Sequence, residues 1–261
     1  MQPPPKIWQW PNVLAFDAAL IAALWLMTLE RMHHLELGWK VHTVLALSVW
    51  LTYLADRLCD VKSRNTANLL SVRHRFSKYY TPQLWRLWFI VLIINLAMAT
   101  QLTWTQQKHG AQLLAVCLVY TLLNQKLSRR FFPKESCVAL IYAGGVAVFL
   151  PQAIPWGFFE AFAFLCLLNC LMIGAKERQI DSKMQVHSLA TVVTERYLTP
   201  LALCAAGLSL WSEIDLAYEL AFSFILIALI HGLRQRISIE GFRVLLDASL
   251  LIAPALSLGI R

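Results

Sequence analysis

Two pairs of carboxylates stand at the ends of long apolar runs in this chain, and each pair has the spacing of one helical turn. Asp56 and Asp60 follow the run VHTVLALSVWL, and Glu177 and Asp181 follow AFAFLCLLNCLMIGA. Residues four apart lie on one face of a helix, so the two acids of a pair repel each other. Carboxylates at the edge of a bilayer are costly as well, so a partner of opposite charge has to offset that cost.

A divalent cation is the first such partner. Mg²⁺ prefers carboxylate oxygens and is commonly shared with substrate phosphates. We therefore predict that Asp56, Asp60, Glu177 and Asp181 face one another across a cavity, bind Mg²⁺ and form the catalytic centre. The alternative is an interfacial cluster of ion pairs, in which Arg57 and Arg178 neutralise the acids that they follow in the chain.

Basic side chains on the same predicted side as the acids could bind the oxygens of a diphosphate. The predicted diphosphate-binding set consists of Arg57, Lys62, Arg73, Arg75, Lys126, Arg129 and Arg130, and Lys134 is a further member of this basic group. Most of these residues fall in two predicted connections between helices. One connection follows the first acidic pair, and the other contains the stretch LSRRFFPKE.

The composition indicates a membrane protein of helices. Hydrophobic residues make up 58% of the 261 residues and charged residues 15%, against about 25% charged residues in soluble domains. A soluble all-α protein is disfavoured, because nearly every apolar run is apolar on all sides rather than along one stripe. We predict nine membrane-spanning helices, at residues 12–30, 40–56, 84–105, 111–126, 135–153, 156–175, 198–212, 216–233 and 242–260.

The basic residues predict the orientation of these spans. A cytoplasmic N-terminus places 19 of the 23 lysines and arginines on the cytoplasmic side and four on the opposite side, as the positive-inside rule requires. The chain is then one integral membrane domain, residues 1–261, in the cell (inner) membrane, with cytoplasmic cap loops at 57–83 and 176–197. A basic cytoplasmic face suits anionic membrane lipids or phosphorylated substrates. Nucleic acid is not an expected partner, because no soluble domain is predicted to bind it.

Several polar residues lie inside the predicted spans, where a polar group is a candidate for function. Asn169 lies two turns before Glu177, and we expect it either to line the same cavity or to bond a neighbouring helix. Asp247 lies one turn after Arg243, so a local ion pair is expected there. Asp17 lies about one turn inside the first span and is not assigned a role.

The two acidic motifs resemble those of the UbiA superfamily of intramembrane prenyltransferases. The first motif of that family is N-D-x-x-D-x-x-x-D, and this chain reads TYLADRLCD, so that Asp56 and Asp60 match its second and third acids. The second family motif resembles D-x-x-x-D-x-x-x-G-x-x-S, and this chain reads ERQIDSKMQVHS. Four positions depart from the family pattern. In the first motif Thr52 replaces Asn and Tyr53 replaces the first Asp, and in the second motif Glu177 replaces the first Asp and Gln185 replaces Gly.

The resemblance implies an all-α membrane protein, a bundle of nine transmembrane helices that encloses a cytoplasm-facing cavity. It implies a prenyltransferase that uses Mg²⁺ to transfer an isoprenyl group from a prenyl diphosphate to a lipophilic or aromatic acceptor. The alternative is a transport or lipid-binding membrane protein that keeps the scaffold without catalysis. A CDP-alcohol phosphotransferase is disfavoured, because its acids form one continuous cluster and those of this chain are split between two distant segments.

The predicted orientation is tested by cysteine accessibility. We expect a cysteine at Ser63 to react with a membrane-impermeant reagent only from the cytoplasmic side, and a cysteine at Gln107 only from the outside. The reverse pattern would overturn both the orientation and the site that is built on it.

Overall fold

A computed structural model describes residues 5–62, 71–127, 132–150, 155–183, 189–212 and 214–259. These ranges contain helices and no strand, which confirms the predicted all-α class. Within them, each predicted span overlaps a helix of 14 residues or more. The long helices are α2 (Phe16–Met32), α3 (Trp39–Lys62), α5 (Thr81–Ala99), α6 (Trp104–Leu127), α7 (Lys134–Ala147), α8 (Trp156–Lys183), α10 (Leu198–Trp211), α11 (Ala217–Gly232) and α12 (Ile239–Gly259).

Short helices connect and cap the long ones. The structure has η1 (Ile7–Gln9) and α1 (Trp10–Val13) before α2, α4 (Val72–Tyr79) before α5, α9 (Leu189–Val192) and η3 (Glu195–Tyr197) before α10, and η4 (Arg234–Arg236) before α12. The predicted cap loops are therefore partly helical. α3 continues beyond the predicted end of its span because Leu58 and Val61 are fully buried on its inner face. Each acidic pair thus lies within one helix, α3 or α8.

Three described helices are long and apolar enough to cross a membrane, namely α5, α8 over Trp156–Arg178, and α12. A fourth is counted if Ile7–Val13 and Phe16–Met32, which meet at an angle of 75°, form one broken span. The nine-span arrangement is not confirmed by this criterion. α7 and α10 are the shortest of the long helices, with 14 residues each. A helix of this length extends about 21 Å at 1.5 Å per residue, whereas a bilayer core is about 30 Å thick.

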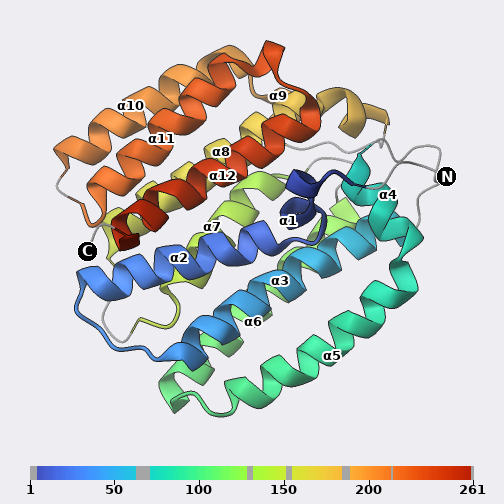
Figure 1. Cartoon of the computed structure of the whole chain (residues 1–261), viewed down its shortest axis with the longest axis vertical. Helices are drawn as coiled ribbons and strands as arrows, with labels where there is room; N and C mark the ends of the chain where they lie inside the picture. Colours follow the sequence, from blue (N-terminus) through green and yellow to red (C-terminus); the bar gives the residue numbers. More distant parts are fainter. Residues whose placement is uncertain are drawn as a thin grey trace.

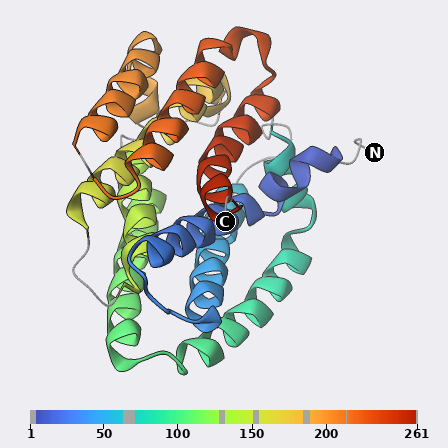
Figure 2. The same cartoon turned by 60° about the vertical axis from the view of Figure 1, so that its left-hand side comes forward.

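The long helices run side by side in one bundle (Figures 1 and 2). α2 packs against α3 and α12, α3 also packs against α5, and α11 packs against both α10 and α12. α1, α4 and α9 lie at one end of the bundle, and the C-terminal end of α12 lies at the other (Figure 1). The first turn of α2 and the last turns of α3 and α8 therefore meet at the end that α1 and α4 cover.

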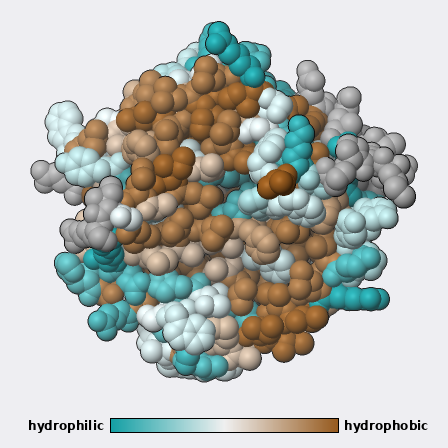
Figure 3. Space-filling view, in the orientation of Figure 1, coloured by the Kyte–Doolittle hydropathy of each residue, from teal (hydrophilic) through white to brown (hydrophobic). Residues whose placement is uncertain are grey.

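The outside of the bundle is apolar over large areas. On α5, Ile90 and Ile93 are more than half exposed, and Leu118 and Leu122 on α6 are as well. Figure 3 shows wide apolar patches over the face formed by α10 and α11 and over α5. Contiguous exposed apolar surface of this kind marks contact with lipid or with another protein. The exterior and the apolar helices are compatible with a membrane protein.

Substitutions at two glycines, Gly174 and Gly207, test how tightly the helices pack. A Cβ added at Gly174 in α8 would lie 2.5 Å from Cβ of Ala190 in α9, whereas a Cβ at Gly207 in α10 would meet nothing within 4 Å. We expect Gly174→Ala to lower the free energy of unfolding by about 1–3 kcal/mol, because overpacking forces the backbone to move. Thermal unfolding in detergent measures the effect.

The control is Gly207→Ala, which should leave stability unchanged or raise it by up to about 1 kcal/mol, since alanine favours a helix over glycine. A Gly174→Ala protein as stable as the Gly207→Ala protein would contradict the packing described for α8 and α9.

Candidate functional site

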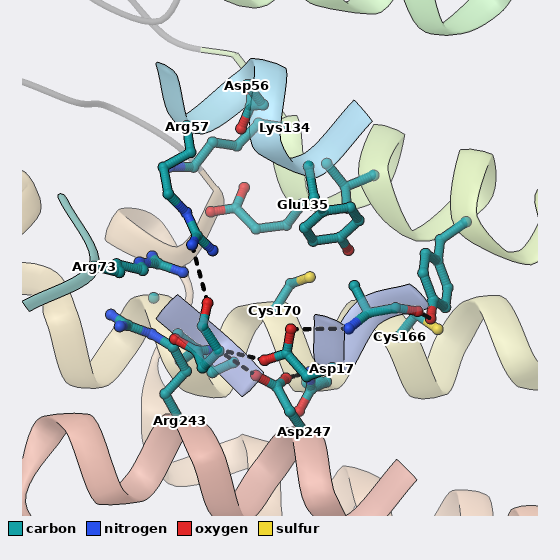
Figure 4. A pocket seen from close by; sticks show the side chains of 18 of the residues that line it. Asp17, Asp56, Arg57, Arg73, Lys134, Glu135, Cys166, Cys170, Arg243 and Asp247 are labelled. Carbon is teal, nitrogen blue, oxygen red and sulfur yellow. Dashed lines mark hydrogen bonds between the residues drawn. The ribbon is translucent and has the colours of Figure 1, made fainter. Parts of the chain in front are cut away.

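A charged cavity of about 260 Å³ lies among the ends of the helices that α1 and α4 cover. Its lining comes from α1, α2, α3, α4, α6, α7, α8 and α12. The charged residues that line it are Asp17, Asp56, Asp60, Glu135, Glu177 and Asp247 on the acidic side, and Arg57, Arg73, Lys134 and Arg243 on the basic side. Figure 4 labels eight of these ten side chains around one space, namely Asp17, Asp56, Arg57, Arg73, Lys134, Glu135, Arg243 and Asp247. Carboxylates outnumber the lysines and arginines, so the lining favours a cation or a donor of hydrogen bonds.

The structure brings together much of the predicted site. Asp56 and Asp60 of α3 line the same cavity as Glu177 of α8, and Arg57 and Arg73 of the predicted diphosphate-binding set line it too. Arg75, Lys62 and Lys126 are not part of its lining, and the last two are exposed. Arg129, Arg130 and the side chain of Asp181 lie outside the described residues. The roles assigned to all these residues stay predictions.

Glu177 is held by two arginines from other helices. Its carboxylate forms an ion pair with Arg243 of α12, and its Oε2 lies 3.5 Å from Nη2 of Arg73 in α4. Arg243 is only 1% exposed and also lies 3.2 Å from Oε2 of Glu240. Two arginines therefore offset the charge of the Glu177 carboxylate, and its role as a metal ligand stays a prediction. Sequence reasoning missed Arg243 as its partner.

The alternative of local ion pairs is wrong for the described residues. Arg178 donates through Nη2 to the carbonyl oxygens of Ala190 and Val193, at 3.0 and 2.9 Å. Arg57 donates through Nη1 to the carbonyl oxygens of Asn12 and Val13, at 2.9 and 2.5 Å. Both arginines thus bind carbonyl groups near helix ends, where cations are favoured, instead of the acids that precede them.

The guanidinium of Arg57 is buried within the bundle, at 6% exposure. An arginine side chain stays positively charged at neutral pH even when it is buried. Arg57 therefore contributes a fixed positive charge to the cavity wall, at a position that is set by its bonds to the end of α1.

Asp56 and Asp60 project from adjacent turns of α3 into the cavity. Oδ1 of Asp56 is buried and has no hydrogen-bond partner among the described residues. A buried carboxylate oxygen without a partner calls for a ligand or an ion, since such atoms are otherwise nearly always bonded. Oδ1 of Asp56 therefore fits a ligand of Mg²⁺.

Asp17, Asp247, Asn12 and Asn169 form a second cluster, which we call the inner acidic cluster. Nδ2 of Asn12 donates to Oδ2 of Asp17 at 2.7 Å and to Oδ2 of Asp247 at 3.1 Å. Nδ2 of Asn169 donates to Oδ1 of Asp247 at 3.1 Å. Asn169 thus both lines the cavity and bonds a neighbouring helix, and the predicted ion pair of Asp247 with Arg243 is wrong. Carboxylates within apolar runs were the sequence signal for this cluster.

Three tyrosines and a glutamate complete the polar lining. Tyr142 donates from its hydroxyl to the carbonyl oxygen of Ala18 at 2.6 Å, and its ring lies 6.1 Å from that of Tyr53, edge to face. Tyr120 lines the cavity from α6. Glu135, which the sequence did not single out, accepts hydrogen bonds from the backbone N–H groups of Leu189 and Ala190 and so caps α9.

Comparison of the chain with protein-family models, curated proteins and solved structures finds no match. The cavity and the two acidic motifs are therefore the features that bear on function. In the part of the chain that the structure describes, no three His, Cys, Asp or Glu side chains are placed to bind a metal together. Mg²⁺ does not require such a group, because proteins commonly hold it through one or two carboxylates, water and substrate phosphates.

The ion pair of Glu177 with Arg243 gives a prediction about stability. We expect Arg243→Ala to lower the free energy of unfolding by about 3–5 kcal/mol, because it leaves a buried carboxylate without its main partner. Adding Glu177→Gln to that variant should restore a large part of the loss, since the remaining side chain is no longer charged. Denaturation of the purified protein in detergent measures both changes.

Arg86→Ala is the matched control, because Arg86 lies on the exposed surface of α5. Its cost should stay within about 0.5 kcal/mol. An Arg243→Ala protein with the stability of the Arg86→Ala protein would show that Glu177 does not depend on Arg243.

Proposed function

We propose that this chain is an intramembrane prenyltransferase. It would transfer an isoprenyl group from a prenyl diphosphate to a lipophilic or aromatic acceptor with the assistance of Mg²⁺. The observation that carries the proposal is the meeting of both acidic motifs in one charged cavity inside an otherwise apolar bundle. Asp56 and Asp60 come from the first motif and Glu177 from the second, with Arg57 and Arg73 beside them.

The diphosphate would lie at the covered end of the cavity, near the last turns of α3 and α8. Arg57 and Arg73 supply fixed positive charges there, and Lys134 at the start of α7 supplies a third. Positive groups that are already in place stabilise the negative charge that grows on a departing diphosphate, at little reorganisation cost. Arg73 belongs to α4, so this short helix would help to close the site over the bound diphosphate.

Asp56 and Asp60 would hold Mg²⁺, which fits the buried and unpartnered Oδ1 of Asp56. A bound Mg²⁺ supplies Lewis-acid stabilisation to the oxygens of the leaving diphosphate. Glu177 would act differently from the prediction. It would hold Arg73 and Arg243 in place and thereby position one of the diphosphate-binding arginines.

The prenyl chain would extend among apolar and aromatic side chains. Tyr53 and Tyr142 line the cavity with their rings edge to face. The allylic carbon gains cationic character as the diphosphate departs, and aromatic faces attract cations. The tyrosine rings would therefore shelter the reacting carbon from water and stabilise its charge.

The proposed function includes the predicted topology. All nine long helices would cross the cell membrane with the N-terminus in the cytoplasm, and the cavity would open on the cytoplasmic side. The apolar exterior of the bundle supports this arrangement. The basic residues of α4, which are Arg73, Arg75 and Lys78, lie at the same end as the cavity, and lysines and arginines are enriched on the cytoplasmic side of membrane proteins.

A second candidate is a transport or lipid-binding protein that uses the same cavity without catalysis. The pairing of Glu177 with Arg73 and Arg243 favours this candidate, because the two arginines offset the charge of one of the predicted metal ligands. Such a protein would bind an amphiphile with an anionic head group and would release no diphosphate.

Binding of geranyl diphosphate to the purified chain in nanodiscs tests the proposed function. We expect binding to require Mg²⁺, and slow release of inorganic diphosphate to follow. Asp56→Asn should weaken the Mg²⁺-dependent binding by at least about tenfold, which corresponds to about 1.4 kcal/mol. Calorimetry with Mg²⁺ or with EDTA measures the affinity, and a coupled diphosphate assay measures the release.

Asp215→Asn is the matched control, because Asp215 pairs with His33 at the connection between α10 and α11. It should bind geranyl diphosphate as the unchanged chain does. Binding that is equal with Mg²⁺ and EDTA and is followed by no diphosphate release would favour the transport or lipid-binding candidate and contradict the transferase.

A further inference from the structure

The polar lining of the cavity is divided by depth. In α8, Asn169 lies eight residues before Glu177, which is about 12 Å along the helix axis at 1.5 Å per residue. In α12, Asp247 lies four residues beyond Arg243, which is about 6 Å further from the covered end. Asn169 and Asp247 therefore lie deeper in the bundle than the ion pair of Glu177 with Arg243. Asn12 of α1 connects Asp247 to Asp17 in the first turn of α2.

The inner acidic cluster contains two carboxylates and no cation of its own. Among the described residues, neither Asp17 nor Asp247 has a basic nitrogen within the 4.0 Å of an ion pair, whereas Glu177 has two arginines. Asp17 and Asp247 share the amide nitrogen of Asn12, so both carboxylates are within reach of one small group. Asp17 is buried and Asp247 is half-buried, and two carboxylates this close and this shielded from water need a proton or a ligand that donates hydrogen bonds.

Asn169 gives an independent sign of a ligand. Its side chain is 8% exposed and lines the cavity. Its Nδ2 donates to Asp247, and its Oδ1 has no hydrogen-bond partner within the described part of the chain. The cluster therefore presents acceptor oxygens of Asp17, Asp247 and Asn169 to the cavity, while the amide nitrogens of Asn12 and Asn169 are already bonded to carboxylates.

The two depths of the cavity suit two different ligand chemistries. The outer part carries Arg57, Arg73 and Lys134 and suits an anion. The inner part is acidic and accepts hydrogen bonds, so it repels an anion and attracts N–H and O–H groups. Tyr53 precedes Arg57 in α3 by one turn and faces Tyr142, so these rings lie beside the path between the two parts.

We propose that the inner acidic cluster is the acceptor subsite of the transferase, and that it selects an amine or an alcohol over a carboxylic acid. This inference rests on the proposed function. In the reaction, the bond between C1 of the prenyl group and the diphosphate oxygen breaks, and its electron pair leaves with the diphosphate. A bond forms between C1 and the nucleophilic atom of the acceptor. The proton that this atom loses passes to a carboxylate oxygen of Asp17 or Asp247.

The selectivity is measured with three small probes that share one ring. Tyramine, tyrosol and 4-hydroxyphenylacetate carry an amine, an alcohol and a carboxylate at the same position. We expect tyramine and tyrosol to bind the purified full chain in nanodiscs about tenfold more tightly than 4-hydroxyphenylacetate, the size of effect that one charged hydrogen-bonding group produces. Asp247→Asn should abolish the preference for tyramine, and Asn169→Ala should weaken it.

Glu160→Gln is the matched control, because Glu160 lies on the exposed face of α8. It should keep the preference of the unchanged chain. The order of the affinities of the three probes for the unchanged chain tests the inference by itself. The test therefore remains if a variant fails to fold. Tightest binding of 4-hydroxyphenylacetate, or a preference that persists in a folded Asp247→Asn protein, would overturn the inference.

Geranyl diphosphate binding, measured on the same samples, separates this inference from the proposed function. If geranyl diphosphate binds with Mg²⁺ but the probes show the opposite order, the acceptor assignment is wrong and the donor site stands. If the probes follow the expected order but geranyl diphosphate does not bind, the inner acidic cluster is a binding site as described, and the transferase proposal fails.

Discussion

The charge enclosed by the apolar bundle is the constraint on which the rest of this structure depends. A charge that leaves water for the interior of a protein costs several kcal/mol unless a partner of opposite sign is placed well. Ten charged side chains line the cavity, six of them acidic. The ion pair of Glu177 with Arg243 is the most buried of the resulting contacts, and it joins α8 to α12. Glu240 continues the same network by accepting a hydrogen bond from the backbone N–H of Val72 at the start of α4.

This network gives each carboxylate of the cavity a different set of bonding partners. The hydrogen bond from the start of α4 to Glu240 of α12 helps to place Arg73 beside Glu177. Glu177 consequently lies between two arginines. Asp56 keeps an unpartnered oxygen in the same cavity, and Asp247 is bonded to amides alone among the described residues. Three acids that look alike in the sequence thus acquire three different environments, suited to positioning an arginine, binding a cation, and accepting a proton.

The sequence predicted the helices well, because long apolar runs that end at charged residues locate them directly. It also predicted that Asp56, Asp60 and Glu177 lie at helix ends on one side, and all three line one cavity. It could not predict their partners. Glu177 lies 66 positions before Arg243 in the chain, and Asn12 meets Asp247 across a separation of 235 positions. Such contacts depend on the rotation of each helix about its axis, which runs that are apolar on all sides do not specify.

The local ion pairs failed for the same physical reason. Arg57 and Arg178 follow an acid directly, but adjacent residues on a helix point in different directions. Each arginine reaches backbone carbonyl groups at a neighbouring helix end instead. The extent of α3 beyond Asp56 was also not predicted, because burial of Leu58 and Val61 outweighs the polar residues around them.

The central claim is that the cavity binds Mg²⁺ with a diphosphate between α3 and the basic residues of α4 and α7. The most direct test is an experimental structure of the full chain with Mn²⁺ in place of Mg²⁺ and with geranyl thiodiphosphate, a slowly reacting analogue of the donor. The account predicts anomalous density for Mn²⁺ beside Asp56 and Asp60, with the thiodiphosphate against Arg57, Arg73 and Lys134. A cavity that excludes both, or an analogue bound outside it with no Mn²⁺ at Asp56, would contradict the account.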